Sequence, residues 1–323
     1  LRNLIVVVTK SNQFGLHDNA SDSELERILR KRGSDYDSML ENHREQKAFE
    51  EGVARTLTDM GLKVEMASRL TYNDELINWC DVVVPCGGDG TFLLAASRVR
   101  DANKPVIGFN SAPHKSVGRL CLPTWCSNDV KGALQALKEV CQKNVAILAG
   151  EVFIGESVTS RVSLLRLQVD NGKWTHTKSS GLCVTTGTGS TSWHFSINCL
   201  RTHSVLELMK ILGEDFGVKM DVSLEKAREV AERYNQKLMF PPDSEQLAYS
   251  VREYITFEDW PAPKGLRARD RASAVQVRSH CTDAGLVVDG SVSFPFNDGT
   301  EALLEVHPED SLMTVQMDDT LPY

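Results

Sequence analysis

A chain of 323 residues is long enough for two domains that each bury a core, and its 41% hydrophobic and 25% charged residues are typical of a globular protein. Its formal net charge of -8 argues against nucleic acid as the main partner, because phosphate backbones are bound through clustered Lys and Arg. No stretch approaches the roughly 20 apolar residues that a membrane span needs. Any anionic ligand would therefore be held locally, by backbone amides and helix N-termini.

The eight cysteines favour reduced thiols in an intracellular protein. They form no Cys-x-x-Cys pair of the kind expected in a zinc ribbon, and a chain of this size needs no disulfide scaffold. The chain begins at Leu1 without a methionine, so we expect that a segment preceding it has been removed or left out.

The first 125 residues alternate strand and helix patterns. Apolar runs rich in β-branched residues predict buried parallel strands within 1–10, 62–68, 81–86 and 104–110. Helix patterns lie between and beside them, at 21–31, 43–60, 73–79 and 91–99. This alternation predicts an α/β domain over residues 1–125, built on a doubly wound parallel sheet.

Beyond residue 126 the pattern changes to short strand runs separated by turn signals such as Asp170-Asn171-Gly172. We therefore predict a mainly antiparallel β domain over residues 126–300, with a helical insertion at about 204–237. The C-terminal segment 301–323 is expected to return toward the N-terminal domain.

The stretch VVVPCGGDGTFLLAAS carries the first candidate site, in Gly87, Gly88, Asp89 and Gly90. Asp-Gly is a common hairpin signal, but the apolar helix pattern that follows, with Thr91 as the predicted N-cap, indicates a turn from strand to helix. Ligands bind at such turns in parallel sheets, and three glycines let backbone amides approach a phosphate. Asp89 would then hold Mg²⁺, accept a proton from a hydroxyl, or only shape the turn.

A second stretch, VTTGTGSTSWHFSIN, repeats the pattern of a strand, a small-residue turn and a helix. Its hydroxyl groups can bond phosphate or ribose oxygens. Such a cluster alone is usually a solvated loop, and only together with the glycine turn does it indicate a nucleotide site. The candidate residues here are Thr188, Gly189, Ser190, Thr191, Ser192, Trp193 and Ser196.

With both stretches in hand, the chain resembles the NAD kinase family, and most of all its mitochondrial branch in animals. GGDGTFLLAAS and TGTGSTSWHFSIN match the two family motifs, while GEVFIGES, SSGL, VVDG, FNDG and GRLCLP follow the mitochondrial branch. The resemblance implies a Rossmann-like N-terminal domain, a C-terminal β-sandwich and a homodimer. It also implies a place in the mitochondrial matrix, with NAD and ATP as the partners and neither nucleic acid nor membrane.

The reaction that the resemblance implies is transfer of the γ-phosphoryl group of ATP, with Mg²⁺, to the adenosine ribose 2′-hydroxyl of NAD. Asp89 would act as general base, and Gly87, Gly88, Gly90 and Thr91 would lie near phosphate. On the NAD side, Glu151 matches the acidic residue of the family's Asn-acidic pair. The turn Thr188–Ser192, which we call the hydroxyl turn, matches residues that hold the dinucleotide, as do Trp193 and Ser196. Leu122 falls where the family often has a phenylalanine beside adenine.

Several assignments stay open at this stage. Trp193 is equally compatible with core packing, and His194 is expected to be structural. Lys10, Lys115 and Arg119 could neutralise phosphate, although such residues are more often merely solvated. No residue is assigned as a protein ligand for a metal.

Two departures from the family pattern bear on activity. Gly150 stands where the family has asparagine, and the lost contact is expected to weaken NAD binding by about 1 to 3 kcal/mol, so that restoring asparagine would lower the KM for NAD. The segment 124–149 is short and mostly of helix pattern, where the family places a strand that opens the β domain.

Three alternatives remain at the level of sequence. A lipid kinase of the diacylglycerol or sphingosine type shares the Gly-Gly-Asp-Gly-Thr turn, but such kinases match the second motif poorly. A 6-phosphofructokinase uses a related turn, although its other motifs are missing. The third alternative is a dinucleotide-binding partner whose turnover is weakened by Gly150 and the short segment.

Overall fold

The computed structural model describes residues 4–9, 22–140, 144–147, 150–255, 266–290, 292–315 and 317. Contacts divide the chain into two compact units, which we call unit 1 (residues 1–146 and 312–323) and unit 2 (residues 147–311). The sequence analysis places the boundaries after residues 125 and 300 instead.

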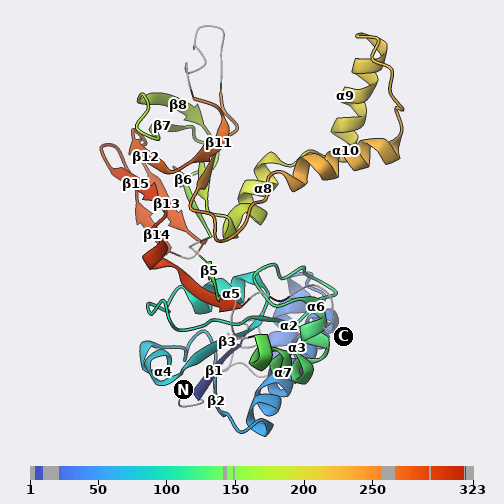
Figure 1. Ribbon diagram of the computed structural model, residues 1–323, viewed down its shortest axis with the longest axis vertical. Coiled ribbons are helices and arrows are strands. Elements are labelled where there is room, and N and C mark those ends of the chain that lie inside the picture. Colours follow the sequence, from blue (N-terminus) through green and yellow to red (C-terminus); the bar gives the residue numbers. More distant parts are fainter. Residues whose placement is uncertain are drawn as a thin grey trace. The chain divides into compact units, whose positions relative to one another are not determined.

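Unit 1 is built on a four-stranded parallel sheet with the order β2-β1-β3-β4 (Figure 1). The strands are β1 (Leu4–Thr9), β2 (Lys63–Ala67), β3 (Val82–Gly87) and β4 (Phe109–Asn110). The order reverses between β1 and β3, so their carboxyl ends form the switch point at which parallel sheets bind ligands. The predicted doubly wound α/β architecture is confirmed.

Helices cover both faces of this sheet. They are α2 (Asp22–Lys31), α3 (Tyr36–Asp59), α4 (Asp74–Trp79), α5 (Asp89–Ala96), α6 (Thr124–Asn128) and α7 (Val130–Val140). On one face, Val53 and Leu57 of α3 and Leu137 of α7 pack against Ile5 and Val7 of β1. Because side chains alternate along a strand, Val6 and Val8 point to the other face, and α4 and α5 contact β1 there.

Two elements of unit 1 differ from the sequence prediction. Helix α3 begins at Tyr36, seven residues before the predicted start, because Asp35 caps it by accepting the Ser38 N–H at 3.1 Å. Of the strand predicted at 104–110, only Phe109–Asn110 is a regular strand, although Val106 forms an isolated parallel bridge with Val83 of β3. On its other side, the Val106 N–H bonds to the Met313 carbonyl at 2.9 Å.

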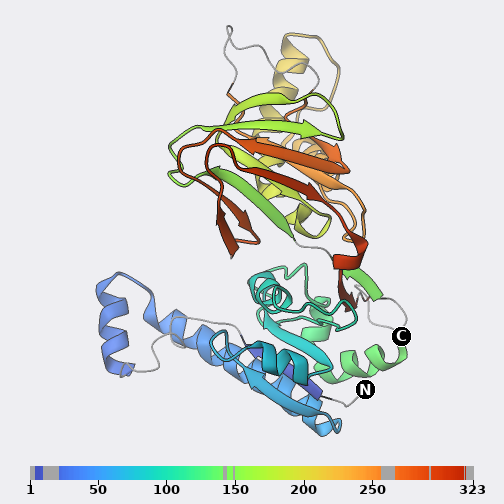
Figure 2. The same ribbon diagram turned by 90° about the vertical axis from the view of Figure 1, so that its left-hand side faces the viewer.

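Unit 2 is a sandwich of two antiparallel sheets packed face to face (Figure 2). One sheet has six strands in the order β11-β10-β9-β6-β13-β14, and the other has four in the order β15-β12-β7-β8. The core between them draws on both sheets, with Ile154 and Leu182 from the first and Leu165 and Val277 from the second. The predicted β-sandwich is therefore confirmed.

The six-stranded sheet contains β6 (Glu151–Glu156), β9 (Gly181–Thr185), β10 (Leu247–Arg252), β11 (Arg269–Ala272), β13 (Ala284–Val288) and β14 (Val292–Pro295). The four-stranded sheet contains β7 (Ser163–Val169), β8 (Thr175–Ser179), β12 (Ala274–Ser279) and β15 (Glu301–Glu305). Between β7 and β8, Asp170 and Asn171 have φ angles of 48° and 59°, which is why residues that tolerate the left-handed region occupy this predicted turn.

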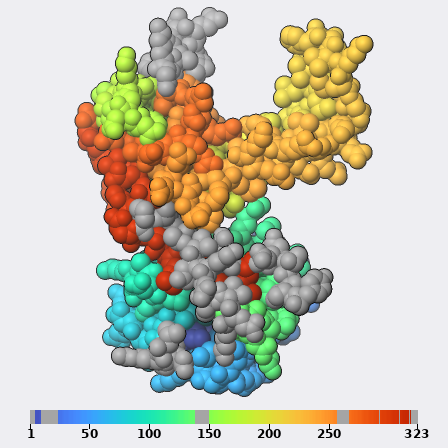
Figure 3. Space-filling model, viewed as in Figure 1, coloured from blue at the N-terminus to red at the C-terminus, as the bar shows by residue number. Residues whose placement is uncertain are grey.

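The predicted helical insertion consists of α9 (Thr202–Glu214) and α10 (Leu224–Gln236), which follow the short helix α8 (Trp193–Asn198). The pair of helices α9 and α10 projects away from the sheets of unit 2 (Figure 3). Its small core is made of Val205, Met209, Ala227 and Ala231. Toward its tip large apolar side chains are exposed, including Phe216 at 73%.

The short segment between Pro123 and Gly150 contains α6, α7 and the strand β5 (Asn144–Ile147). Strand β5 pairs with β16 (Leu312–Val315) in a separate two-stranded sheet. The C-terminal strand β16 also belongs to unit 1, because Thr314 Oγ1 donates to the Val106 carbonyl at 2.8 Å.

Across the described parts of the chain, no helix combines the length and apolar character needed to cross a membrane. The seven described cysteines are free thiols, and Cys141 lies outside the described residues.

We expect Leu57→Ala in α3 to lower the free energy of unfolding of unit 1 by about 2 to 5 kcal/mol, because Leu57 is fully buried against the sheet and truncation leaves a cavity. Leu70→Ala is the matched control, since Leu70 is 73% exposed and its truncation should change stability by no more than about 0.5 kcal/mol. Hydrogen exchange of the β1 and β3 amides in urea measures both. Equal effects of the two substitutions would contradict the assigned core.

Candidate functional site

The glycine turn lies at the switch point of the parallel sheet, where β3 ends at Gly87 and α5 begins at Asp89. Thr91 is not the N-cap that the sequence analysis predicts. Gly88 takes that place with an extended backbone (φ -97°, ψ -168°), and its carbonyl accepts the Thr91 N–H at 2.9 Å. Helix α5 therefore begins two residues earlier, and Asp89 lies in its first turn.

Two glycines of this turn have different surroundings. A Cβ at Gly87 would lie 2.2 Å from Thr91 Oγ1, so the buried Thr91 side chain occupies the space that any other residue at 87 would need. A Cβ at Gly90 would meet no protein atom within 4 Å. Protein packing thus explains the glycine at 87 and leaves the glycine at 90 without a packing reason.

The Asp89 carboxylate is held by one main-chain group. Its Oδ1 accepts the Leu120 N–H at 2.8 Å, and the side chain is partly exposed. Within the described residues, Oδ2 accepts no hydrogen bond. The carboxylate is therefore oriented through one oxygen, while the other can accept a proton or bind a cation.

The loop that supplies Leu120 is organised by Asn110, a residue that the sequence analysis did not single out. Asn110 is 1% exposed, its Nδ2 donates to the Ser116 carbonyl at 2.8 Å and its Oδ1 accepts the Ala112 N–H at 3.1 Å. Gly118 has a φ of 60°, and a Cβ there would lie 2.5 Å from Asn110 Nδ2. Such contacts reach across the loop, so the only sequence signal for them is an asparagine at the end of a predicted strand.

The candidate cations of unit 1 have protein partners or cannot be placed. Lys115 Nζ bonds to Asn42 and to Glu45 Oε2, the latter at 3.1 Å. Arg119 is exposed and also interacts within the protein, and Lys10 lies outside the described residues. Leu122, the candidate adenine neighbour, is 4% exposed and packs in the core of unit 1.

In unit 2, the hydroxyl turn forms a short 3-10 helix, Thr188–Thr191, between β9 and α8. Ser190 is fully buried, donates to the Gly187 carbonyl at 2.6 Å and accepts the Phe240 N–H at 3.2 Å. Ser190 therefore has a structural partner on each side. Thr188 Oγ1, by contrast, is buried with no hydrogen-bond partner in the described structure, an arrangement that costs about 1 to 3 kcal/mol.

The remaining hydroxyl residues of the turn are more accessible. Thr191 is partly buried, while Ser192 and Ser196 are exposed. Ser196 Oγ donates to the Ser192 carbonyl at 3.0 Å, as expected within one turn of helix.

The Glu151 carboxylate lies at the first turn of α8. Its Oε2 accepts the Trp193 N–H at 3.0 Å and lies 3.9 Å from the Cys183 thiol. Burial raises the pKa of Glu151 to about 7, with the negative charge of Asp289 raising it further, and the backbone N–H groups of Trp193 and His194 oppose this rise. Glu151 is therefore a carboxyl group that titrates near neutral pH.

Trp193 is 47% exposed, so it is not a core residue of unit 2. Its ring meets Phe153 edge-on, with centroids 4.9 Å apart, and Arg252 lies 5.9 Å from the ring centroid. A pocket of about 360 Å³ opens beside it, lined by Trp193, Ser196, Ile197, Arg252 and Glu253. The sequence analysis missed Arg252, which lies on β10, more than 50 residues from the motif.

His194 is buried and structural, in line with the sequence analysis. It is 2% exposed, and its Nδ1 lies 3.1 Å from Ser250 Oγ on β10. Burial lowers its pKa to about 4, helped by Arg269 and Arg271. His194 therefore stays neutral at physiological pH and ties α8 to the sheet.

Gly150 packs backbone against backbone with the hydroxyl turn. Its carbonyl accepts the Thr186 N–H at 3.1 Å and the Thr185 hydroxyl at 2.9 Å. A Cβ on Gly189 would lie 2.1 Å from that same carbonyl oxygen. The close approach requires glycine at 189 and fixes the turn upon the start of β6.

Asp289, in the turn after β13, is a second residue that the sequence analysis missed. Its Oδ1 accepts the Glu151 N–H at 2.8 Å, and its own N–H donates to the Glu151 carbonyl at 2.9 Å. A Cβ on Gly150 would lie 2.6 Å from this Oδ1. The Asp-Gly pair of VVDG marks a turn in the sequence, but nothing local links it to residue 150.

The candidate residues thus form two groups. Gly87, Gly88, Asp89, Gly90 and Thr91 gather at the β3–α5 turn of unit 1, and Glu151, the hydroxyl turn and Trp193 gather at the β6–α8 corner of unit 2. In the described ranges, no three His, Cys, Asp or Glu side chains are placed to hold a metal ion.

Comparison with known proteins gives this geometry a context. The family model described as ATP-NAD kinase N-terminal domain matches residues 17–116. NAD kinase 2, mitochondrial, of Homo sapiens is 32% identical over 374 aligned positions, which cover 97% of this chain and 84% of that protein. The same-named protein of Xenopus tropicalis is 31% identical, covering 98% and 91%.

Both alignments are longer than the chain of 323 residues, so these relatives contain residues that have no counterpart here. Among solved structures, an NAD kinase from Archaeoglobus fulgidus in complex with ATP has a TM-score of 0.57 at 17% identity, covering 96% of this chain and 92% of that one. A yeast NADH kinase complexed with NADH has a TM-score of 0.54 at 14% identity, covering 98% and 84%. Identity at this level shows a shared fold, whereas the similarity to the mitochondrial proteins spans nearly the whole sequence. The chain therefore belongs to the NAD kinase family.

Proposed function

We propose that this NAD kinase transfers the γ-phosphoryl group of ATP to the adenosine ribose 2′-hydroxyl of NAD, with Asp89 as general base. The observation that carries this proposal is the Asp89 carboxylate at the switch point of the parallel sheet. One oxygen is fixed by the Leu120 N–H, and the other is free of protein hydrogen bonds among the described residues. A ribose hydroxyl is a poor nucleophile at neutral pH, and a positioned carboxylate contributes typically 10²- to 10⁴-fold.

In the proposed step, the 2′-hydroxyl proton passes to Asp89 Oδ2 while the 2′-oxygen forms a bond to the γ-phosphorus. The bond from that phosphorus to the β,γ-bridging oxygen of ATP breaks, so the products are NADP and ADP. Phosphoryl transfer of this kind depends mainly on positioning and charge neutralisation. The glycine turn suits that task, because Gly90 leaves open space where a phosphate oxygen can approach the backbone.

ATP would bind with Mg²⁺, whose ligands would come chiefly from the phosphates and water. The partly exposed Asp89 carboxylate is the acidic group of the glycine turn that would face such an ion. Bound Mg²⁺ would supply neutralisation of phosphate charge. The ATP in the Archaeoglobus fulgidus complex and the NADH in the yeast complex support the use of this fold for both substrates.

The NAD side of the site is proposed to lie at the β6–α8 corner of unit 2. The Glu151 carboxylate there can accept hydrogen bonds from ribose hydroxyl groups. The buried Thr188 hydroxyl, which has no hydrogen-bond partner in the described structure, gains one if an oxygen of the ligand or a water reaches it. The half-exposed Trp193 offers a ring face beside a pocket, which suits a planar base. Leu122 would contribute only if its buried side chain rearranges, so we expect it to matter least.

We extend two further properties from the relatives to this chain. The human and rat relatives carry the name mitochondrial, which supports a place in the mitochondrial matrix. We propose that the active enzyme is a homodimer.

Asp89→Asn should lower kcat for NADP formation by about 10²- to 10⁴-fold, because asparagine cannot accept the proton. It should leave the fold intact, since its Oδ1 can still accept the Leu120 N–H. NADP formation and thermal unfolding measure the two effects. Asp129→Asn is the matched control, because Asp129 likewise accepts a backbone N–H, that of Gly132 at 2.9 Å, outside both motifs. Full activity of Asp89→Asn would exclude a general-base role.

Gly90→Ala should reduce kcat/KM for ATP at least tenfold without destabilising unit 1. A Cβ at 90 meets no protein atom, so any loss must come from ligand that the methyl group displaces. Gly52→Ala in α3 is the matched control, as its Cβ also meets nothing, and it should keep full activity. Steady-state kinetics and thermal unfolding separate the two variants. Unchanged kinetics for Gly90→Ala would argue against close approach of phosphate there.

Glu151→Gln should remove a pH dependence of stability. A raised pKa means that the folded state binds the proton more tightly, so the stabilisation is complete below about pH 4.5 and is lost as pH rises through about 7. Partial exposure limits the effect to the order of 1 kcal/mol. The difference in unfolding free energy between the parent chain and Glu151→Gln, measured from pH 5 to 8, isolates this group from Asp289. A difference that does not change with pH would contradict the raised pKa.

A further inference from the structure

The start of β6 is held by a carboxylate that the proposed mechanism does not use. Asp289 Oδ1 accepts the Glu151 N–H at 2.8 Å, and the backbone of Asp289 returns a second hydrogen bond to the Glu151 carbonyl at 2.9 Å. The Gly150 N–H also acts on this carboxylate, because it lowers the pKa of Asp289. Glu151 is therefore tied to Asp289 through both its N–H and its carbonyl group.

This arrangement depends on the glycine at 150. A Cβ there would lie 2.6 Å from Asp289 Oδ1, closer than real Cβ contacts occur. The oxygen cannot move away without cost, because it ends a short side chain and already accepts the Glu151 N–H. Gly150 and Asp289 are thus complementary, since the carboxylate fills the space that the missing side chain leaves.

We propose that Asp289 is a positioning residue for NAD binding, which fixes the Gly150–Glu151 backbone so that the Glu151 carboxylate lies at the first turn of α8. This inference rests on the proposed role of Glu151 in holding NAD. It reverses the expectation from sequence that asparagine at 150 would improve the KM for NAD. An asparagine there displaces Asp289 and with it the support of Glu151.

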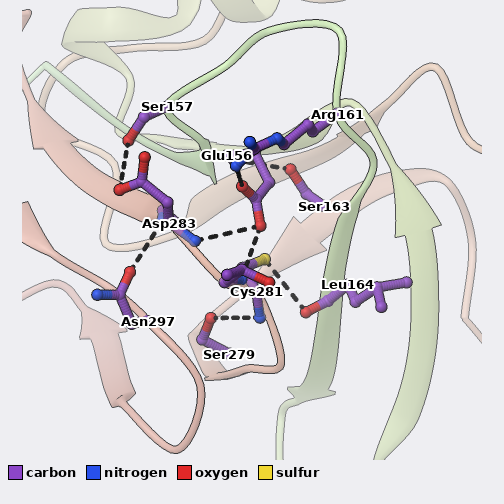
Figure 4. A network of polar contacts seen from close by, with 11 residues as sticks. Glu156, Ser157, Arg161, Ser163, Leu164, Ser279, Cys281, Asp283 and Asn297 are labelled. Carbon is purple, nitrogen blue, oxygen red and sulfur yellow. Dashed lines mark hydrogen bonds and ion pairs between the residues drawn. The ribbon is translucent and has the colours of Figure 1, made fainter.

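The opposite end of β6 provides a contrast (Figure 4). Glu156 Oε1 accepts the Thr282 N–H at 2.8 Å, and Asp283 Oδ1 accepts from the Ser157 hydroxyl at 3.4 Å. Asp283 precedes β13 and Asp289 follows it, so the two aspartates flank one strand. Only Asp289 contacts the residues that lead to Glu151, which makes Asp283 a matched control.

The test uses the full chain with Asp289→Gly, Asp289→Asn and Asp283→Asn. Glycine adopts the φ of 48° at residue 289 without strain, so Asp289→Gly removes the carboxylate alone. It should raise the KM for NAD about tenfold or more and leave the KM for ATP unchanged. Asparagine keeps an acceptor oxygen, so Asp289→Asn should restore most of the NAD affinity. Asp283→Asn should match the parent chain in both constants.

The pH profile supplies a readout that a purely structural role would not move. The groups that face the Glu151 carboxylate are Asp289, the Cys183 thiol on β9 and the backbone N–H groups of Trp193 and His194 on α8. Of these, Asp289 is the group whose negative charge raises the pKa of Glu151. The midpoint at which the KM for NAD changes with Glu151 ionisation should therefore shift to lower pH in Asp289→Asn, and not in Asp283→Asn.

A coupling experiment completes the test. Gly150→Asn alone should raise the KM for NAD, and Gly150→Asn combined with Asp289→Gly should cost less than the product of the two single changes, because the collision is gone. A lower KM in Gly150→Asn, an unchanged KM in Asp289→Gly, or equal rises for NAD and ATP would overturn the proposal.

Failure of the proposed function has a different signature. If the parent chain forms no NADP, that function fails, and hydrogen exchange of the Glu151 and Trp193 amides decides the inference by itself. Faster exchange at both amides in Asp289→Gly supports the positioning role, and unchanged exchange overturns it.

Discussion

Hydrogen bonds from main-chain N–H groups to carboxylate oxygens are the interaction on which both groups of candidate residues depend. Asp89 is oriented by Leu120 in unit 1, while in unit 2 Glu151 is oriented by Trp193 and is itself supported by Asp289. Each bond joins a turn at the end of a strand to a segment distant in the sequence. Because a charged acceptor makes a shorter and stronger bond than a neutral one, a few such contacts can fix a turn that no side-chain packing holds.

Under the proposed function, this reliance on main-chain groups accounts for how an acidic protein binds anionic substrates. The chain has a net charge of -8, and Lys115, in the loop after β4, is engaged with Asn42 and Glu45 on α3. What the glycine turn offers is backbone, in the space left open at Gly90 and in the first turn of α5. Neutralisation of charge by the backbone is local, so it does not require a basic protein surface.

Local patterns predicted the architecture because its determinants are local. A strand, a turn and a helix are specified within 16 residues by the β-branched run before Gly87 and the apolar pattern after Gly90. The strands of unit 2, before and after the helical insertion, follow from the alternation of apolar residues and from turn residues. The N-cap was wrong because Thr91 has the residue type of a cap, whereas the extended backbone of Gly88 takes that position. The strand predicted at 104–110 was too long, since before Phe109 the segment pairs with β3 through the isolated bridge of Val106 to Val83. The bond of Val106 to Met313, more than 200 residues away, is a contact that no local pattern indicates.

Gly150 shows why a site cannot be interpreted one position at a time. Considered alone, a glycine in place of asparagine is a lost contact, and the sequence analysis treated it so. In the fold, the same glycine leaves room for Asp289, which accepts a hydrogen bond from the N–H of Glu151, 138 residues away in the sequence. The Gly150 carbonyl also accepts hydrogen bonds from Thr185 and Thr186, the residues that lead into the hydroxyl turn. A side chain that is missing at one position can thus be the condition for a side chain at another. The support of Glu151 is then a property of the pair, and neither residue reveals it separately.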